Sequence, residues 1–278
     1  MVLSGDWVDI RFQEEVRYRK PVGIYWAQAA VVSAAALLGL PNATTSIWLY
    51  RVPPLSGAVG AMLLTYWTAL ALVSRRAAVL AAAMMAASVL LGVEARLATT
   101  DAMLLLAVVA AMGTLARAYG AGPEGAPARA PGPRVAATFW VALAGGVLLE
   151  GPVILVVVGL TVATLAAADR SVRWAARLRP LAGIATFAVL VLPWFLAITR
   201  RAGDVFFESM AKDALARALV AREAHGAPPG TYLLLFWATF WPGAAVAGSA
   251  APSVWASRRE PATRSRGSCR PGSSSSSR

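Results

Sequence analysis

Long apolar runs restrict what this chain can fold into more than any other feature of its sequence. Six runs follow residue 50, at 53–73, 77–93, 102–115, 135–168, 181–198 and 232–251. Several approach the ~20 residues that an α-helix needs to cross ~30 Å of hydrocarbon. Lipid does not tolerate unpaired backbone polar groups, and the runs lack the alternation of a membrane barrel. The sequence therefore predicts an all-α, polytopic membrane protein.

The composition agrees with this fold class. The 278 residues are 58% hydrophobic and only 14% charged, whereas about a quarter of a typical soluble domain is charged. The net charge is +12, but the arginines gather at the ends of the apolar runs and not along one face, as topology signals do. We therefore expect no nucleic-acid partner. The one cysteine, Cys269, excludes an intramolecular disulfide and a CxxC metal site.

The number of membrane crossings follows from the lengths of the runs. The run at 135–168 would span ~51 Å as one helix, too long for one crossing, and Glu150-Gly-Pro interrupts it. We interpret it as a hairpin of two helices with Glu150 at the turn. About seven transmembrane helices are then expected, at 53–73, 77–94, 102–118, 135–149, 151–168, 180–199 and 230–251.

Alternate connections between these helices differ in charge. One set has short basic loops, such as Arg75-Arg76 and the four arginines between 170 and 179, which marks the cytoplasmic side. The other set includes the long loop 200–229. It collects half of the 14 acids: Glu94, Asp101, Glu150, Asp204, Glu208, Asp213 and Glu223. This outer side is the candidate active face.

The first 40 residues have two interpretations. Four acids and four bases lie between Asp6 and Lys20, directly before an apolar segment. If residues 22–40 cross the membrane, the charged segment is cytoplasmic. If they lie along the outer interface, which suits Tyr25 and Trp26, the charged segment is outside with the other acids. We favour an outer charged hairpin followed by an interfacial helix.

The C-terminal residues differ sharply from the rest. We place the boundary of the membrane domain at residue 251 and expect residues 252–278 to be a disordered basic tail. From about Thr263 the tail is rich in arginine and serine. It is either a cytoplasmic tail or the frame-shifted end of a GC-rich coding sequence. We favour the frame shift, because a bundle that ends here would be incomplete.

An ordered series of short motifs resembles the polyprenyl-phosphate-dependent membrane glycosyltransferases. This superfamily contains the protein O-mannosyltransferases and the lipid A aminoarabinose transferase. The motifs are Ser4-Gly-Asp-Trp, Tyr18-Arg-Lys-Pro with Tyr25-Trp26, Arg51-Val-Pro-Pro-Leu-Ser-Gly, Glu94-Ala-Arg-Leu-Ala-Thr-Thr-Asp101, Gly151-Pro152 and His225-Gly-Ala-Pro-Pro.

The resemblance implies a GT-C helical bundle over residues 1–251 with interfacial helices. It implies transfer of a sugar from a polyprenyl-phosphate carrier to a lipid or protein acceptor, at the periplasmic face of the bacterial inner membrane. Partners would be this donor, the acceptor and membrane lipids. The alternative is a transporter or flippase-like protein without covalent chemistry, but ionisable residues at mid-membrane and internal repeats, typical of transporters, are not evident.

Three departures from the family pattern affect these expectations. The family's first transmembrane helix and its following Asp-Glu pair have no counterpart here, so we expect this chain alone to be an inactive fragment. Arg19 stands where many members have a glutamate that binds a divalent ion. Glu150 stands where a lysine often precedes Gly-Pro. A family-type metal is therefore doubtful.

Basic residues at the membrane edge are the candidates for substrate binding. A sugar phosphate needs a cation for its leaving phosphate. Lys20, before the rigid Pro21, is either that contact or an anchor to lipid headgroups. Tyr18, in the same motif, and Arg96 are the other candidate substrate-binding residues.

Asp101 and His225 are the candidate catalytic residues. Asp101 either belongs to the site, through an ion pair with Arg96, or caps the helix that follows Thr99 and Thr100. His225 is the only histidine and is either functional or a solvated loop residue. Four further acids have a functional or a merely solvated interpretation: Asp6, Asp9, Glu14 and Glu15.

Overall fold

The structure is a computed structural model that describes residues 1–2, 4–12, 15–16, 20–120, 132–209, 211–212 and 230–259. A short antiparallel pair, β1 (Arg11–Phe12) and β2 (Glu15–Val16), precedes the helices. The helices are α1 (Gly23–Leu37), α2 (Ile47–Ala69), α3 (Arg75–Ala87), α4 (Val89–Glu94), α5 (Asp101–Tyr119), α6 (Pro133–Glu150), α7 (Val153–Asp169), η1 (Arg173–Leu178), α8 (Pro180–Ala202), α10 (Thr231–Thr239) and α11 (Gly243–Arg259).

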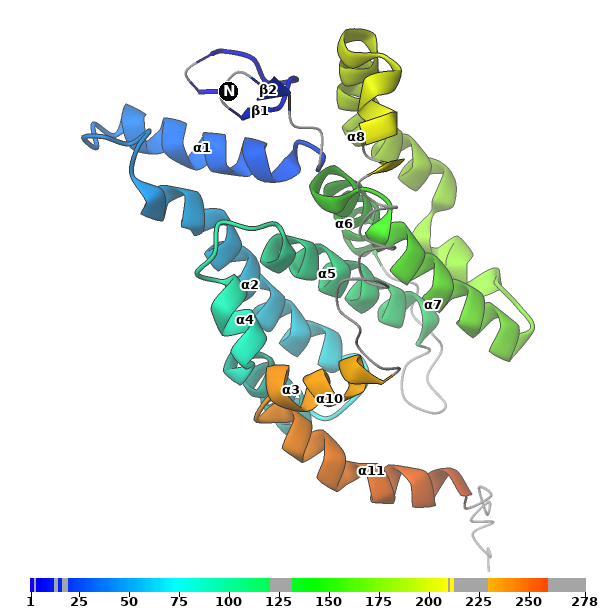
Figure 1. Cartoon of the computed structure of the whole chain (residues 1–278). Coiled ribbons are helices and arrows are strands. Elements are labelled where there is room, and N and C mark those ends of the chain that lie inside the picture. Colours follow the sequence, from blue (N-terminus) through cyan, green and yellow to red (C-terminus); the bar gives the residue numbers. More distant parts are fainter. Residues whose placement is uncertain are drawn as a thin grey trace, which may run out of the picture.

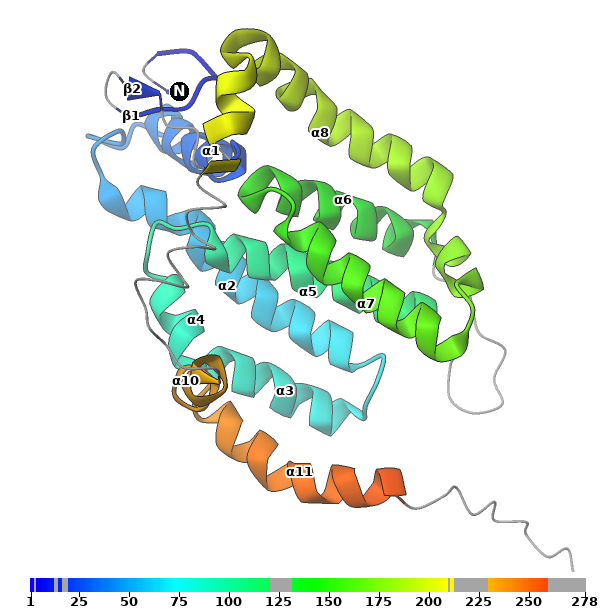
Figure 2. The same ribbon diagram turned by 45° about the vertical axis from the view of Figure 1, so that its right-hand side comes forward.

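The long helices lie side by side in one bundle. Helix α5 packs between α2 and α6, α3 covers the outer side of α2, and α8 covers α6 (Figure 2). Helix α1 is viewed nearly end-on in Figure 2, where the bundle helices lie along the page, so α1 runs across one end of the bundle. The strand pair and the N-terminus lie beside α1 at the same end (Figure 1). An orientation across the helix ends is the one expected for the predicted interfacial helix.

Among the described residues, four helices are long and apolar enough to cross a membrane: α2, α5, α6 and α8. Helix α7, with 17 residues, and α1, with 15, are apolar but shorter. About seven crossings were expected, and two of the expected helices are broken in the structure. The segment 77–94 divides at Ser88, which is extended and donates its hydroxyl to the Thr239 carbonyl at 3.1 Å. The segment 230–251 divides before Pro242, whose ring disfavours helix at the preceding residue.

Two further predicted boundaries differ from the structure. Residues 204–209, expected in the outer loop 200–229, are helical, because the fully buried Phe206 packs on Trp194 and Phe195. Helix α11 continues to Arg259, beyond the expected boundary at 251. The remainder of both segments, 213–229 and 260–278, lies outside the described residues, so the predicted frame shift stays a prediction.

Large apolar side chains cover much of the outside of the bundle, and small residues supply many of the contacts between its helices. Leu181 is 87% exposed and Val189 is 72% exposed, both on α8. The interior face of α5 is instead formed by small residues such as Ala111 and Gly113. Large apolar surfaces are rare on soluble monomers, and small residues at helix contacts are typical of membrane bundles. The arrangement confirms the predicted all-α membrane fold.

Two glycines determine how closely the helices approach at the α1 end. A Cβ on Gly23, the first residue of α1, would lie 2.7 Å from the Leu148 carbonyl oxygen of α6. A Cβ on Gly57 of α2 would lie 2.9 Å from the Ala102 carbonyl oxygen of α5. At both glycines the nearest atoms of the neighbouring helix belong to its backbone, so a side chain at either position would collide with it. The first contact brings the chain just before α1 to the last turn of α6.

The N-terminal segment is attached to α1 and α8 by aromatic side chains. Trp26 of α1 donates its indole N–H to the Trp7 carbonyl at 2.8 Å, and Trp194 of α8 donates to the Val8 carbonyl at 3.2 Å. Apolar residues from the segment and both helices form one cluster: Ile10, Val22, Trp194, Ile198 and Phe206. Segments nearly 190 residues apart in sequence therefore share one small core.

Asp6 adds an electrostatic contact to the same attachment. Its carboxylate accepts hydrogen bonds from the backbone N–H groups of Val8 at 2.9 Å and Asp9 at 3.2 Å, and it pairs with Arg201 of α8. The Val8 N–H, followed by the Asp9 N–H and Arg201, lowers the pKa of Asp6, while partial burial opposes them. The ionised carboxylate is thus the form that the folded chain prefers.

The α1–α6 contact predicts the effect of a single methyl group. Gly23→Ala should destabilise the chain by about 1–3 kcal/mol, because a Cβ there forces two backbones apart. Gly145→Ala on α6 is the matched control, since its Cβ would meet nothing within 4 Å. Thermal unfolding in detergent, followed by tryptophan fluorescence, measures both. Equal melting temperatures for the two variants would contradict the close contact.

The Asp6 contacts predict a pH-dependent stability. The folded pKa of Asp6 is lowered, so its contribution is present above the unfolded value of ~3.9 and is lost as pH falls through the folded pKa. Asp6→Asn should therefore melt earlier than wild type at neutral pH, by less than about 1 kcal/mol because the carboxylate is partly exposed. The difference should vanish in acid. If Asp6→Asn is less stable than wild type by the same amount at every pH, the prediction is wrong. Glu208→Gln is the control, because Glu208 forms an exposed pair with Lys212.

Candidate functional site

The candidate site lies where α5 begins and α6 ends. The two helices are antiparallel neighbours, so Thr100, before α5, and Glu150, the last residue of α6, reach the same end of the bundle. Lys20 reaches it from a third direction, because Pro21 and Val22 lead directly into Gly23 and its contact with α6. Residues 80 and 130 positions apart thus meet at one point.

Three side chains form a connected cluster there. The Lys20 ammonium donates to the Thr100 hydroxyl oxygen at 2.6 Å and forms an ion pair with Glu150 Oε1. The Thr100 hydroxyl donates its own proton to the same carboxylate oxygen. Thr100 is fully buried and the Glu150 side chain is 9% exposed, whereas the Lys20 side chain is 31% exposed. The Lys20–Thr100–Glu150 cluster is therefore open on its cationic side.

Burial and helix dipoles account for the pairing. A carboxylate at the last residue of a helix meets the negative end of the helix dipole, which disfavours it. A buried carboxylate also needs a cation or hydrogen-bond donors. Lys20 and Thr100 supply both to Glu150, and the N-terminus of α5 begins beside Thr100. The cluster therefore stabilises a carboxylate that lies at an unfavourable helix end.

The structure separates Arg96 from Asp101. Arg96 donates to the Gly92 carbonyl at 3.1 Å, and no described ion pair joins it to Asp101. Asp101 is exposed in the first turn of α5, whose cap residue is Thr100, and neither side chain caps the helix. The expected pair is not among the described ion pairs, and the expected Asp101 cap is not formed. Thr100, at the cap position, uses its hydroxyl in the cluster instead.

Asp101 instead lines an apolar cavity of about 360 Å³ between α4, α5 and α10. Glu94 lies at the same cavity and accepts a hydrogen bond from the Thr99 hydroxyl at 2.8 Å. The other walls are mainly apolar: Met85, Leu90, Leu91, Leu105, Phe236 and Phe240. The candidate acid thus stands at the edge of an apolar space, one residue from Thr100.

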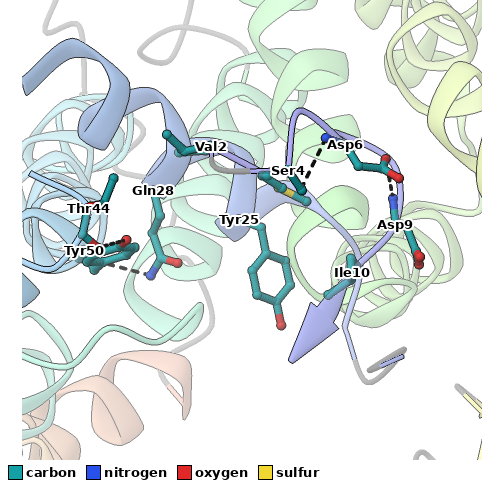
Figure 3. Close-up of a pocket in the computed structure, with 11 residues that line it drawn as sticks. Val2, Ser4, Asp6, Asp9, Ile10, Tyr25, Gln28, Thr44 and Tyr50 are labelled. Atoms are coloured by element: carbon teal, nitrogen blue, oxygen red, sulfur yellow. Dashed lines mark hydrogen bonds between the residues drawn. The ribbon is translucent and has the colours of Figure 1, made fainter. Parts of the chain in front are cut away.

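A second, more polar cavity of about 570 Å³ lies between the N-terminal segment, α1 and the start of α2. Figure 3 shows Tyr25 and Gln28 extending from α1 in the same direction, with Asp9 on the opposite segment. Gln28 donates to the Tyr50 carbonyl at 3.3 Å. Tyr25 is five residues after Lys20, so their Cα atoms are at most ~18 Å apart. Asp6 and Asp9 both line this cavity.

The described residues do not offer a metal site. No group of three or more histidine, cysteine, aspartate or glutamate residues among them lies close enough to hold an ion. The best-buried carboxylate, Glu150, is paired with an ammonium group, which repels cations. His225, Tyr18 and Glu14 fall outside the described residues, as does the side chain of Glu15, so their predicted roles stay predictions.

Thr100 and Glu150 were not singled out as site residues from the sequence. The sequence did hold a signal for Glu150, since it replaces the lysine that often precedes Gly-Pro in the resembling family. A reversed charge at this position indicates a basic partner. Thr100 carried no such signal, because Thr-Thr-Asp before an apolar run is an ordinary helix start.

Comparisons with known proteins identify the family. The sequence model of the family described as dolichyl-phosphate-mannose-protein mannosyltransferase matches residues 40–205, more than half of the chain. No individually curated protein matches the sequence.

Two solved structures share the fold, both of ArnT from Cupriavidus metallidurans and both 21% identical to this chain. The structure bound to undecaprenyl phosphate has a TM-score of 0.68 and is matched over 94% of this chain and 45% of its own. The apo structure has a TM-score of 0.63, over 74% and 37%. The chain therefore spans less than half the length of these structures. The predicted GT-C bundle is confirmed, and the chain belongs to the dolichyl-phosphate-mannose-protein mannosyltransferase family.

Proposed function

We propose that the protein represented by this chain transfers a sugar from a polyprenyl-phosphate carrier to a lipid or protein acceptor. The observation that carries this proposal is the Lys20–Thr100–Glu150 cluster at the end of an apolar bundle, with its ammonium on the open side. Family membership supports the class of reaction. One structure that shares the fold binds undecaprenyl phosphate, which supports a polyprenyl carrier here.

Lys20 suits the phosphate of such a carrier. In glycosyl transfer the bond between the anomeric carbon and the phosphate oxygen breaks, and the phosphate keeps the electron pair. A new bond forms to an acceptor oxygen, whose proton passes to a base. Charge that develops on the leaving phosphate is stabilised by a preorganised cation. Pro21 and the Gly23 contact hold Lys20 in place before the ligand arrives.

The two cavities suit the remaining parts of the substrates. The polar cavity presents a tyrosine, an amide and a carboxylate (Figure 3), groups that hydrogen-bond and stack against sugars. The apolar cavity places Asp101 beside a space that fits hydrocarbon. We assign the proton-accepting role to Asp101 or His225 and substrate contacts to Arg96 and Tyr18.

We place this reaction on the periplasmic side of a bacterial inner membrane. The cluster and the apolar cavity include acids from the outer set expected from loop charge, and α1 lies across that end of the bundle. A transporter without covalent chemistry is less well supported. The described ion pairs lie at helix ends and not midway along the spans, where transport sites are common.

The chain's two lysines allow a matched test of Lys20. Lys20→Met should weaken binding of undecaprenyl phosphate to the purified chain in detergent at least tenfold, because a phosphate loses a charge-assisted contact. Lys212→Met is the control, since Lys212 is 77% exposed and pairs only with Glu208 among described residues. Microscale thermophoresis with lipid in excess of protein measures both. Equal affinities for wild type and Lys20→Met would refute the assignment.

A further inference from the structure

Lys20 already has an anionic partner before any phosphate arrives. Its ammonium is paired with the Glu150 carboxylate, and the Thr100 hydroxyl joins the two. A phosphate on the open side of Lys20 therefore comes close to a buried negative charge. Two anions at one ammonium repel each other, and the repulsion is strong where little water screens it.

The Glu150 carboxylate has little freedom to move away from Lys20. It ends α6, and Gly151 follows at φ 71°, so the chain turns at once into Pro152 and α7. Its side chain is 9% exposed, against 31% for Lys20. The ammonium, on a long flexible stem, is the movable member of the pair, and the carboxylate is the fixed one.

We propose that Glu150 is a positioning residue that competes with the substrate phosphate for Lys20. The inference rests on the proposed function, since it requires a phosphate at Lys20. In the empty site the carboxylate holds the ammonium where the phosphate will bind. In the occupied site it opposes the phosphate, so Glu150 lowers the affinity for the carrier and favours its release.

This competition acts unequally on donor and product. The donor is a phosphodiester with one negative charge, whereas the carrier left after transfer is a phosphate monoester that approaches two charges at neutral pH. A lysine without a counter-charge would hold the product more tightly than the donor. A fixed carboxylate beside it penalises the more highly charged product more, which limits product inhibition.

The test removes the carboxylate and keeps its shape. Glu150→Gln should bind undecaprenyl phosphate, the monoester product, about five- to tenfold more tightly than wild type. Glu208→Gln is the matched control, because it removes the acidic partner of the chain's other lysine and makes the same change in net charge. Its affinity should equal that of wild type. Unchanged or weaker binding by Glu150→Gln overturns the proposal.

A double variant shows whether the effect passes through Lys20. In Lys20→Met the phosphate is no longer drawn toward Glu150, so adding Glu150→Gln should raise the affinity much less than it does in the wild-type background, and a full gain there would overturn the competition. Normal binding by Lys20→Met alone would refute the Lys20 assignment and thereby the competition. If Lys20→Met binds weakly but Glu150→Gln binds no more tightly than wild type, the competition is refuted and the Lys20 assignment stands. The two failures are therefore distinguishable.

A milder variant protects the test against a folding defect. Glu150→Asp keeps the charge but shortens the side chain by one methylene, so it should tighten binding by about two- to threefold. Thermal unfolding of each variant shows whether it is folded at the assay temperature. Binding by folded Glu150→Asp that is weaker than wild type would count against competition, because a shorter carboxylate reaches Lys20 less well.

Discussion

An ammonium, a hydroxyl and a carboxylate meet where α1, α5 and α6 come together, and much of the surrounding geometry serves that meeting. Glu150 is buried at the disfavoured end of its helix, so it needs Lys20. Lys20 arrives there because α1 starts against the last turn of α6, and α1 starts there because Gly23 has no side chain. The interaction that compensates a buried charge thus depends on a helix contact that a single methyl group would open.

Small residues make the rest of the bundle possible in a similar way. A bundle surrounded by hydrocarbon gains little from hiding large apolar side chains, so its helices associate through close backbone packing. Many leucines and valines face outward, whereas alanines and glycines supply many of the contacts between α2, α5 and α6. The packing therefore differs from that of a soluble protein of equal hydrophobicity.

The sequence predicted the fold class and the family because both depend on patterns that survive without tertiary context: apolar runs, basic loops and ordered motifs. Helix α1 was also predicted from loop charge. The break before Pro242 was not foreseen, although the proline is a local signal for it. The break at Ser88 was also not foreseen, because it depends on a hydrogen bond to a segment 151 residues away. The pairing of Lys20 with Glu150 was missed for the same reason. Sequence spacing does not show that positions 20 and 150 meet, whereas the close contact of Gly23 with the last turn of α6 brings them together.

The close contact at Gly23 also has a mechanical consequence. Because the backbones of α1 and α6 touch there and those of α2 and α5 touch at Gly57, no side chain separates the helices at these two points. A force on α1, whether from lipid headgroups or from a bound chain, would pass directly into the end of α6. Lys20 lies three residues before this contact, so a shift of α1 against α6 would also change the position of the ammonium.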